Sequence, residues 1–356
     1  MRRPINPAWR QASLPGGAES PSTARPSALG ATVVSDRANE PAFDSDDLRH
    51  LPGFGGGRYA IGRELGRGGM GVVYQADDKV AGHPVALKVL AGDMTDQEVV
   101  DRFLVEAKIG LALVDEHVCR LYDVGVDAIT KRPFMAMELL QGRDLDTLVD
   151  AYQGRTPLAE ACEHVMAACA GLATAHAMGV VHRDVKLSNL FLAETGAGTT
   201  TLKVLDFGVS KAPGFGDVTR MTKTGEIMGS PFYMAPEQVR NAKSVDARAD
   251  VWSLGVALYE LLCGELPFAS LSATQLFAAI LTLPHVPIGQ ERSDLPPAIG
   301  DIIDVALHKD RDRRFASVVA LARALAPYTP RGVELLERVR TRAAAGTGEP
   351  PPRTSR

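Results

Sequence analysis

Six residues, Gly66-Arg67-Gly68-Gly69-Met70-Gly71, follow the spacing GxGxxG. Glycines at this spacing let backbone N–H groups approach phosphate oxygens, because a Cβ atom would hold the phosphate away. A dinucleotide-binding loop opens a helix, but here the strand-like run Val72-Val73-Tyr74 follows. Val72 also stands where a Walker A loop has its lysine. Two interpretations remain, a phosphate-binding hairpin and an ordinary glycine-rich turn.

One cation interrupts the apolar, strand-like run Val85-Ala86-Leu87-Lys88-Val89-Leu90. Alternation along a strand places Ala86, Lys88 and Leu90 on one face. Lys88 is either a lysine whose aliphatic stem covers an edge strand, or a phosphate ligand held by a carboxylate. Glu106, in a segment with helical spacing, is the predicted partner for the second interpretation.

A third set of polar residues lies farther along the chain. It comprises Val181-His182-Arg183-Asp184-Val185-Lys186-Leu187-Ser188-Asn189, then Asp206-Phe207-Gly208 and Ala235-Pro236-Glu237. With the glycine segment, Lys88 and Glu106, these motifs resemble those of protein kinases, in the same order. The resemblance runs from Tyr59 to Pro327 and is to bacterial eukaryotic-like (Hanks-type) serine/threonine kinases. It implies transfer of the γ-phosphoryl group of ATP to serine and threonine hydroxyls of proteins, in bacterial signalling.

Phosphoryl transfer spreads negative charge over the transferred group, so it needs cations and metal ligands. The resemblance assigns Asn189 and Asp206 to Mg²⁺, with Mn²⁺ as an alternative, and their oxygens are hard ligands of the kind such ions prefer. Asp184 accepts a hydrogen bond from the substrate hydroxyl. Lys186 contacts the transferred group, and it favours serine and threonine substrates, since tyrosine kinases usually lack a lysine there.

The same resemblance predicts where ATP lies. The adenine ring is expected among Leu65, Val73, Ala86, Met137 and Phe191, with Glu138 C=O and Leu140 N–H pairing with its edge. The glycine segment and Val72 are expected beside the phosphates. Asp250 is predicted to prop the catalytic loop, and Glu237 and Arg314 to form a structural ion pair.

Two residues depart from the family pattern. Leu187 replaces the usual proline and is expected to loosen the catalytic loop slightly. Gly110, four residues after Glu106, is expected to leave a gap beside His182 and Phe207. That gap keeps open a second hypothesis, a pseudokinase scaffold that binds without catalysis. A third hypothesis, a small-molecule phosphotransferase, conflicts with the peptide-positioning segment 229–237.

The elements between the motifs predict an α+β, two-lobed protein-kinase-like fold. It has a small antiparallel β-rich N-lobe with one key helix and a larger, mainly helical C-lobe. Strands are predicted at 59–65, 72–76, 85–90, 119–126 and 134–139, and helices from Thr95, where Glu98 completes a capping box, and at 157–178, 247–262, 273–281, 299–307, 318–325 and 333–344.

The predicted domains are a disordered arm (1–58), a kinase domain (59–327) and a C-terminal tail with a short helix (328–356). The kinase domain divides into an N-lobe (59–138) and a C-lobe (139–327). The arm holds seven prolines and seven glycines, a composition that cannot offset the entropy of ordering.

Composition excludes several classes of protein. The net charge of -4 argues against a nucleic-acid coat, and the four cysteines show no zinc or disulfide spacing. No apolar run reaches the ~20 residues of a membrane-spanning helix, and the N-terminus lacks the apolar core of a secretory signal. We therefore expect a cytoplasmic protein that binds ATP and protein substrates, with no nucleic acid and no membrane insertion, and that forms a transient homodimer for trans-autophosphorylation.

We predict autophosphorylation at Thr222 or Thr224, because Arg183 directly precedes Asp184 and can pair with a phosphorylated activation segment. A phosphate there adds a charge of about -1.5 to -2 and one to three charge-assisted hydrogen bonds. Mass spectrometry of protein incubated with ATP checks this prediction. Full activity after changing both threonines to alanine would contradict it.

Overall fold

The computed structural model describes residues 53–68, 71–90, 104, 107–108, 110–196, 198–207, 231–240, 245–268 and 272–345. Several predicted features lie outside the described residues: the arm up to residue 52, Gly69, Met70, the helix start at Thr95, Glu106, Gly208, Thr222, Thr224 and the segment 229–230.

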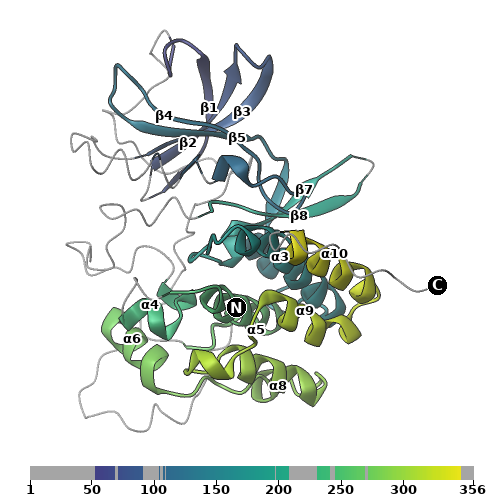
Figure 1. Ribbon diagram of the computed structural model, residues 1–356. Helices are drawn as coiled ribbons and strands as arrows, with labels where there is room; N and C mark the ends of the chain where they lie inside the picture. The colour runs from purple at the N-terminus through teal and green to yellow at the C-terminus, as the bar shows by residue number, and fades with distance from the viewer. Residues whose placement is uncertain are drawn as a thin grey trace.

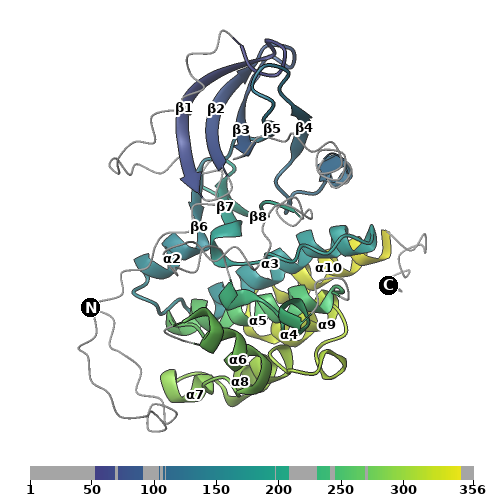
Figure 2. The ribbon, with the colours of Figure 1, turned by 90° about the vertical axis from the view of Figure 1, so that its left-hand side faces the viewer.

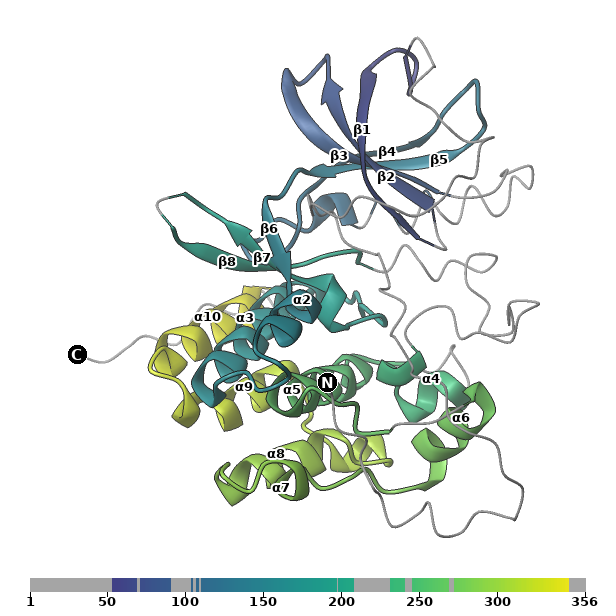
Figure 3. The same cartoon turned by 180° about the vertical axis from the view of Figure 1, so that it is seen from behind.

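Five antiparallel strands form one sheet in the order β1-β2-β3-β5-β4. They are β1 (Tyr59–Gly68), β2 (Gly71–Asp78), β3 (His83–Leu90), β4 (Leu121–Val126) and β5 (Pro133–Glu138). This sheet makes the upper lobe in Figure 1. A second sheet, of β6 (Gly142–Asp144), β7 (Leu190–Glu194) and β8 (Thr200–Val204), lies between the first sheet and the helices (Figure 3).

Helices make up most of the other lobe. They are α2 (Leu145–Ala151), α3 (Leu158–Ala177), α4 (Pro236–Arg240), α5 (Arg248–Cys263), α6 (Ala273–Thr282), α7 (Ile288–Glu291), α8 (Pro297–Ala306), α9 (Val318–Leu325) and α10 (Gly332–Ala345). The long helices α3 and α5 supply much of the core: 12 of the 20 residues of α3 and 14 of the 16 of α5 are buried. α5 therefore has almost no exposed polar face, whereas α3 keeps a partly exposed one at Glu160 and Glu163. None of the described helices combines the length and the apolar character that crossing a membrane requires.

The predicted fold class is confirmed. The five predicted strands of the first lobe match β1 to β5, and the predicted helices after residue 150 match α3, α5, α6, α8, α9 and α10, with shifts of a few residues at their ends. Sequence patterns missed β6, β7, β8, α2, α4 and α7. These elements are short, so they offer few residues over which a period can be recognised.

We assigned residues 53–58 to the arm, but the structure packs them on the sheet. Phe54 is fully buried, and its ring lies 5.3 Å from that of Phe134 on β5. Arg58 pairs with Asp78 at 2.7 Å and with Asp123 at 2.7 Å. Burial of one aromatic ring and this ion-pair network offset the ordering entropy that a glycine-rich segment loses.

The predicted ion pair between Glu237 and Arg314 is present inside the helical lobe. Both terminal nitrogens of Arg314 donate to the Glu237 carboxylate at 2.7 Å, and the arginine side chain has no exposed surface. The pair joins α4, directly after the Ala235-Pro236 turn, to the segment before α9.

Because each charge is buried, we predict that Arg314→Ala lowers the free energy of unfolding by about 3–5 kcal/mol, since it leaves the Glu237 carboxylate unpaired. Urea denaturation measures this change. Arg313→Ala is the matched control, because Arg313 is exposed. Equal effects of the two substitutions would contradict the prediction.

Candidate active site

The catalytic loop, residues 181–189, is held by one buried carboxylate. Asp250 at the start of α5 has no exposed surface and accepts the backbone N–H of His182 at 2.9 Å and that of Arg183 at 2.8 Å. Its Oδ2 also lies 2.7 Å from Nε2 of His176 on α3. Burial alone would raise the pKa of Asp250, but the hydrogen bond with His176, nearby positive charge and the backbone donor hold it below its ordinary value. Asp250 therefore props this loop, as the sequence predicted.

The loop needs such a prop because its backbone is strained. Arg183 has φ 64° and Asp206 has φ 55°, in the left-handed region that non-glycine residues rarely adopt. Each such residue costs about 1–3 kcal/mol, so the surrounding contacts must hold it in place. Arg183 directly precedes the predicted catalytic residue Asp184, and Asp206 is itself a predicted metal ligand.

Hydrogen bonds join the catalytic loop to the segment that carries Asp206. The backbone N–H of Leu205 donates to Asn189 O at 2.9 Å, and Nε2 of His182 lies 2.7 Å from Leu205 O. Nδ1 of His182 accepts the Asp184 N–H at 3.2 Å, so the network assigns the proton to Nε2. The His182 ring also meets Phe207 edge-on at 4.7 Å.

Two ion pairs bring the predicted charged groups together. Nζ of Lys88 lies 2.7 Å from Oδ2 of Asp206, although the two residues come from different lobes. Nζ of Lys186 lies 3.1 Å from Oδ2 of Asp184. The side chains of all four residues are at most 14% exposed, so water screens these charges weakly. Glu106, the predicted partner of Lys88, lies outside the described residues.

Asn189 and Asp206 fit a divalent metal ion. Nδ2 of Asn189 donates to Asp184 O at 2.8 Å and to Asp184 Oδ2 at 3.2 Å, which fixes the orientation of the amide. Within the described part of the chain, Oδ1 of Asn189 and Oδ1 of Asp206 are buried without a hydrogen-bond partner. Such oxygens are unfavourable unless a ligand or ion binds them, and hard oxygens suit Mg²⁺ or Mn²⁺.

The glycine segment is a hairpin between two strands. β1 and β2 pair up to Gly68 opposite Gly71, so the segment connects two strands of the sheet and opens no helix. Gly71 has φ 142°, and a Cβ atom there would stand 2.1 Å from Val89 O on β3. Only glycine fits this close approach of two backbones.

The predicted adenine residues fall into two apolar groups. Leu65, Val73 and Ala86 form one cluster on the sheet, with Leu139 packed against it. Met137, Leu140 and Phe191 belong to another cluster, which includes Leu205. Glu138 lies between the lobes, where its carboxylate pairs with Lys203 of β8 at 2.9 Å.

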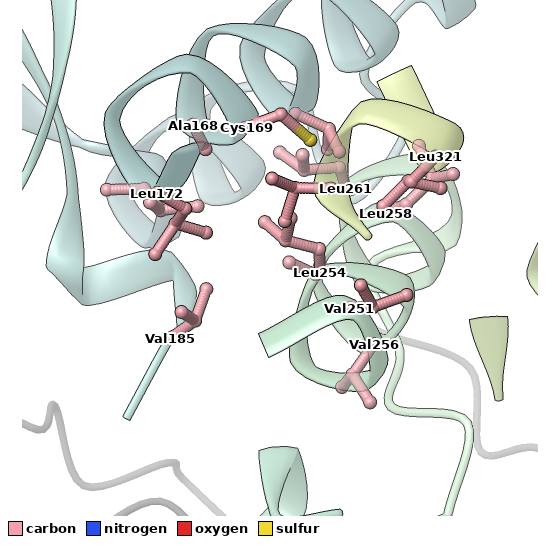
Figure 4. Close-up of a cluster of buried hydrophobic side chains, with 14 of the residues drawn as sticks. Ala168, Cys169, Leu172, Val185, Val251, Leu254, Val256, Leu258, Leu261 and Leu321 are labelled. Carbon is pink, nitrogen blue, oxygen red and sulfur yellow. The ribbon is translucent and has the colours of Figure 1, made fainter. Parts of the chain in front are cut away.

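The catalytic loop is anchored from below by apolar side chains. Figure 4 shows Val185 in one cluster with Leu172 of α3 and Leu254 of α5. Leu187, which we expected to loosen the loop, is fully buried in the same cluster. Its side chain takes an anchoring role, since burial of a leucine contributes about 1.5–3 kcal/mol.

Gly110 lies beside Leu121 in the structure. A Cβ atom on Gly110 would stand 3.1 Å from Cδ2 of Leu121, which is buried at the start of β4. The gap that the sequence predicts beside His182 and Phe207 stays a prediction.

Sequence patterns missed three residues that support the site. His176 binds Asp250 from 74 positions away, and no local signal announces it. Nε2 of Gln238, next to Glu237, donates to Arg183 O at 2.9 Å. Nδ1 of His117 lies 2.9 Å from Leu202 O on β8. Only the position of Gln238, directly after a recognised motif, could have drawn attention.

The sequence and the fold match known proteins. Residues 59–325 match the protein kinase domain family. The chain is 38% identical over 307 residues to serine/threonine-protein kinase Pkn1 of Myxococcus xanthus, covering 85% of this chain and 42% of the relative. It is 34% identical over 274 residues to serine/threonine-protein kinase PknA of Mycobacterium tuberculosis, covering 76% of this chain and 61% of the relative. The crystal structure of the Mycobacterium tuberculosis PknI kinase domain aligns with a TM-score of 0.60 at 26% identity, covering 76% of this chain and 96% of that one.

The chain therefore belongs to the protein kinase domain family. It spans about half the length of the two curated relatives, 42% of Pkn1 and 61% of PknA. Membership implies the use of ATP and a divalent metal ion, in agreement with the two buried oxygens of Asn189 and Asp206.

We predict that Asp250→Asn lowers the free energy of unfolding by about 3 kcal/mol near neutral pH, because the amide loses the buried pair with His176. The lowered folded-state pKa of Asp250 means that its contribution is present above the unfolded pKa, about 4, and is lost as the pH falls through the folded value. Urea denaturation at several pH values should show the two proteins converging in strong acid. Asp301→Asn, at an exposed position on α8, is the control. A difference independent of pH would contradict the role of the charge.

Proposed function

We propose that this chain is an ATP-dependent serine/threonine protein kinase, acting in bacterial signalling. The observation that carries the proposal is the convergence of Lys88 with Asp206 and of Asp184 with Lys186 and Asn189, joined through Leu205. Lys88 comes from the five-stranded sheet, and Asp206 from the segment directly after β8. The other three residues belong to the catalytic loop. Their types suit transfer of a phosphoryl group, in which cations must meet developing negative charge.

In the proposed mechanism, Asp184 orients the attacking hydroxyl. Oδ2 of Asp184 contacts both the Lys186 amine and the Asn189 amide, and these two contacts fix the orientation of the carboxylate. Asp184 accepts a hydrogen bond from the substrate O–H and receives its proton as the new P–O bond forms and the bond to ADP breaks.

Lys88 and Lys186 supply positive charge on two sides of the transferred group. Lys88 is buried among the strands of the first lobe and turns its amine toward the helical lobe, where Asp206 receives it. Lys186 lies beside Asp184 and so beside the attacking oxygen. Because these ammonium groups are already held in place and water screens them weakly, they stabilise the negative charge of the transition state without having to move.

Asn189 and Asp206 are the proposed ligands of Mg²⁺, with Mn²⁺ as the alternative. Their Oδ1 atoms are the buried oxygens that lack partners within the described residues. When bound, the ion neutralises charge on the ATP phosphates. Leu205, held by Asn189 O and His182, keeps the two ligands at a fixed separation.

The segment 231–240 supports a protein substrate. The hydroxyl of Tyr233 binds the carboxylate of Glu260, and Oγ of Ser253 donates to Tyr233 O at 2.8 Å. Gln238 ties the same segment to Arg183, next to Asp184. A peptide laid along this fixed segment brings its hydroxyl to the catalytic loop. Lys186 and the names of Pkn1 and PknA favour serine and threonine hydroxyls.

We further propose control by autophosphorylation of Thr222 or Thr224, with a transient homodimer in which one copy phosphorylates the other. Arg183 supports this proposal, because it lies beside Asp184 and can pair with a phosphate. A phosphothreonine, with its charge of about -1.5 to -2, would join the catalytic loop to the activation segment through charge-assisted hydrogen bonds.

We predict that Asp184→Asn lowers kcat by about 10²–10⁴-fold, because the amide cannot accept the substrate proton. Incubation with labelled ATP and Mg²⁺, followed by phosphosite mapping, measures the change. Wild type should label serine and threonine. If one copy phosphorylates the other, the rate of labelling should rise more steeply than in proportion to the protein concentration. EDTA should abolish the label. Asp301→Asn is the matched control. Equal labelling by Asp184→Asn and wild type, or label on tyrosine alone, would overturn the proposal.

A further inference from the structure

The last described helix, α10, lies beyond the residues 59–325 that match the family model. It runs beside α3, at the end of the helical lobe nearest to the sheets (Figures 1 and 2). Leu335 and Val339 are buried in the main core of that lobe. A Cβ atom on Gly332 would clash with Ala326 O, so the helix begins in close contact with the end of α9. α10 is therefore an integral part of the lobe.

The polar face of α10 reaches a loop of the first lobe, residues 113–118, which lies between the helical residues 110–112 and β4. NH1 of Arg338 lies 2.7 Å from Oε1 of Glu116, and NH2 of Arg342 lies 2.8 Å from the same oxygen. Nε of Arg342 donates to the carboxylate of Asp115. Arg338 and Arg342 are four residues apart, so they project from the same face of the helix. We call these four residues the α10 contact.

The loop that α10 holds is itself packed tightly on α3. Oδ1 of Asp115 accepts the His117 N–H at 2.8 Å, and its Oδ2 accepts the Thr174 hydroxyl at 3.1 Å. A Cβ atom on Gly171 would stand 2.5 Å from His117 O, which shows how closely α3 approaches the loop. The Asp115 side chain is only 7% exposed, so its pair with Arg342 is weakly screened.

The same loop binds the strand that leads to the metal ligand. Val204 N donates to His117 O at 2.8 Å, and Cys119 N donates to Val204 O at 2.9 Å. β8 ends at Val204, two residues before Asp206. On its other side the loop follows the helical residues 110–112. A shift of this loop thus moves the strand that ends two residues before Asp206.

We propose that Arg338 and Arg342 are positioning residues for phosphoryl transfer: through Asp115 and Glu116 they fix the loop whose backbone hydrogen bonds hold β8, and with β8 the position of Asp206. α10, in the helical lobe, thus supports a loop of the first lobe, and we call this support the brace. The proposal rests on the proposed kinase activity. Neither arginine touches substrate, and their effect passes through the backbone hydrogen bonds of His117 and Cys119 with β8.

The test compares two arginines of the same helical region. Arg342→Ala removes the pairs of Arg342 with Asp115 and Glu116, whereas Arg331→Ala removes ion pairs with Glu163 on α3 and with Glu334, neither of which belongs to the loop. We expect Arg342→Ala to lower kcat about tenfold, as a small misplacement of catalytic groups does, and Arg331→Ala to leave it near the wild-type value. Arg342→Lys should recover part of the loss, since it keeps the charge.

A double-mutant cycle separates this contact from a general loss of stability. Adding Glu116→Gln to the double variant Arg338→Ala/Arg342→Ala should lower kcat no further, because both arginine partners of Glu116 are already removed. Thermal unfolding of the same variants measures stability. A loss of kcat that tracks the melting temperature equally in Arg331→Ala and Arg342→Ala would overturn the proposal.

Hydrogen exchange gives a measure that needs no catalysis. Amides in residues 110–121 and 200–207 should exchange faster in Arg342→Ala than in Arg331→Ala, with or without Mg²⁺ and ATP. Unchanged exchange in both segments would overturn the brace even in an active enzyme. Absence of serine or threonine labelling by wild type would overturn the kinase proposal alone, and faster exchange would then still support the structural part of the brace.

Discussion

The Asp250 carboxylate is the contact on which the site depends. It lies where α5 begins, and it takes two consecutive backbone N–H groups of the catalytic loop together with a histidine of α3. Two donors on one carboxylate fix both the position and the direction of the loop. This fixation holds Arg183 in a left-handed conformation, which in turn directs Asp184 toward its partners. A charge buried this deeply is tolerable only because every donor is supplied by the fold.

Hydrogen bonds connect the Asp250 carboxylate to the lobe that holds the five-stranded sheet. His182, the first residue held by Asp250, binds Leu205, and Leu205 directly precedes Asp206. Asp206 then meets Lys88 from the central strand of the five-stranded sheet. Three steps, of which the last spans the lobes, thus connect a helix of one lobe to a strand of the other. The proposed metal ligands lie along this chain of contacts, where positional error would matter most for chemistry.

β8 is supported from a different direction by the loop at residues 113–118, and that loop is bound by α3 and α10. The end of β8 next to Asp206 is therefore held both by the catalytic loop and by α3 and α10. The helical lobe contributes rigidity because α5 and much of α3 are buried. Leu187, which departs from the motif pattern, is itself buried in the core.

The sequence by itself predicted the candidate reacting groups and most of the larger elements. Lys88, Asp184, Asn189 and Asp206 were predicted from the resemblance of their motifs to those of protein kinases, and the long helices from dense apolar segments with start signals such as Thr156-Pro157. Tertiary structure alone decided the partners. Asp206 as the partner of Lys88, His176 as a donor to Asp250, and Arg342 as the clamp of Asp115 join positions 74 to 227 residues apart. No local pattern encodes such pairs, because they form only when separate elements pack, and packing depends on the shape of the whole core.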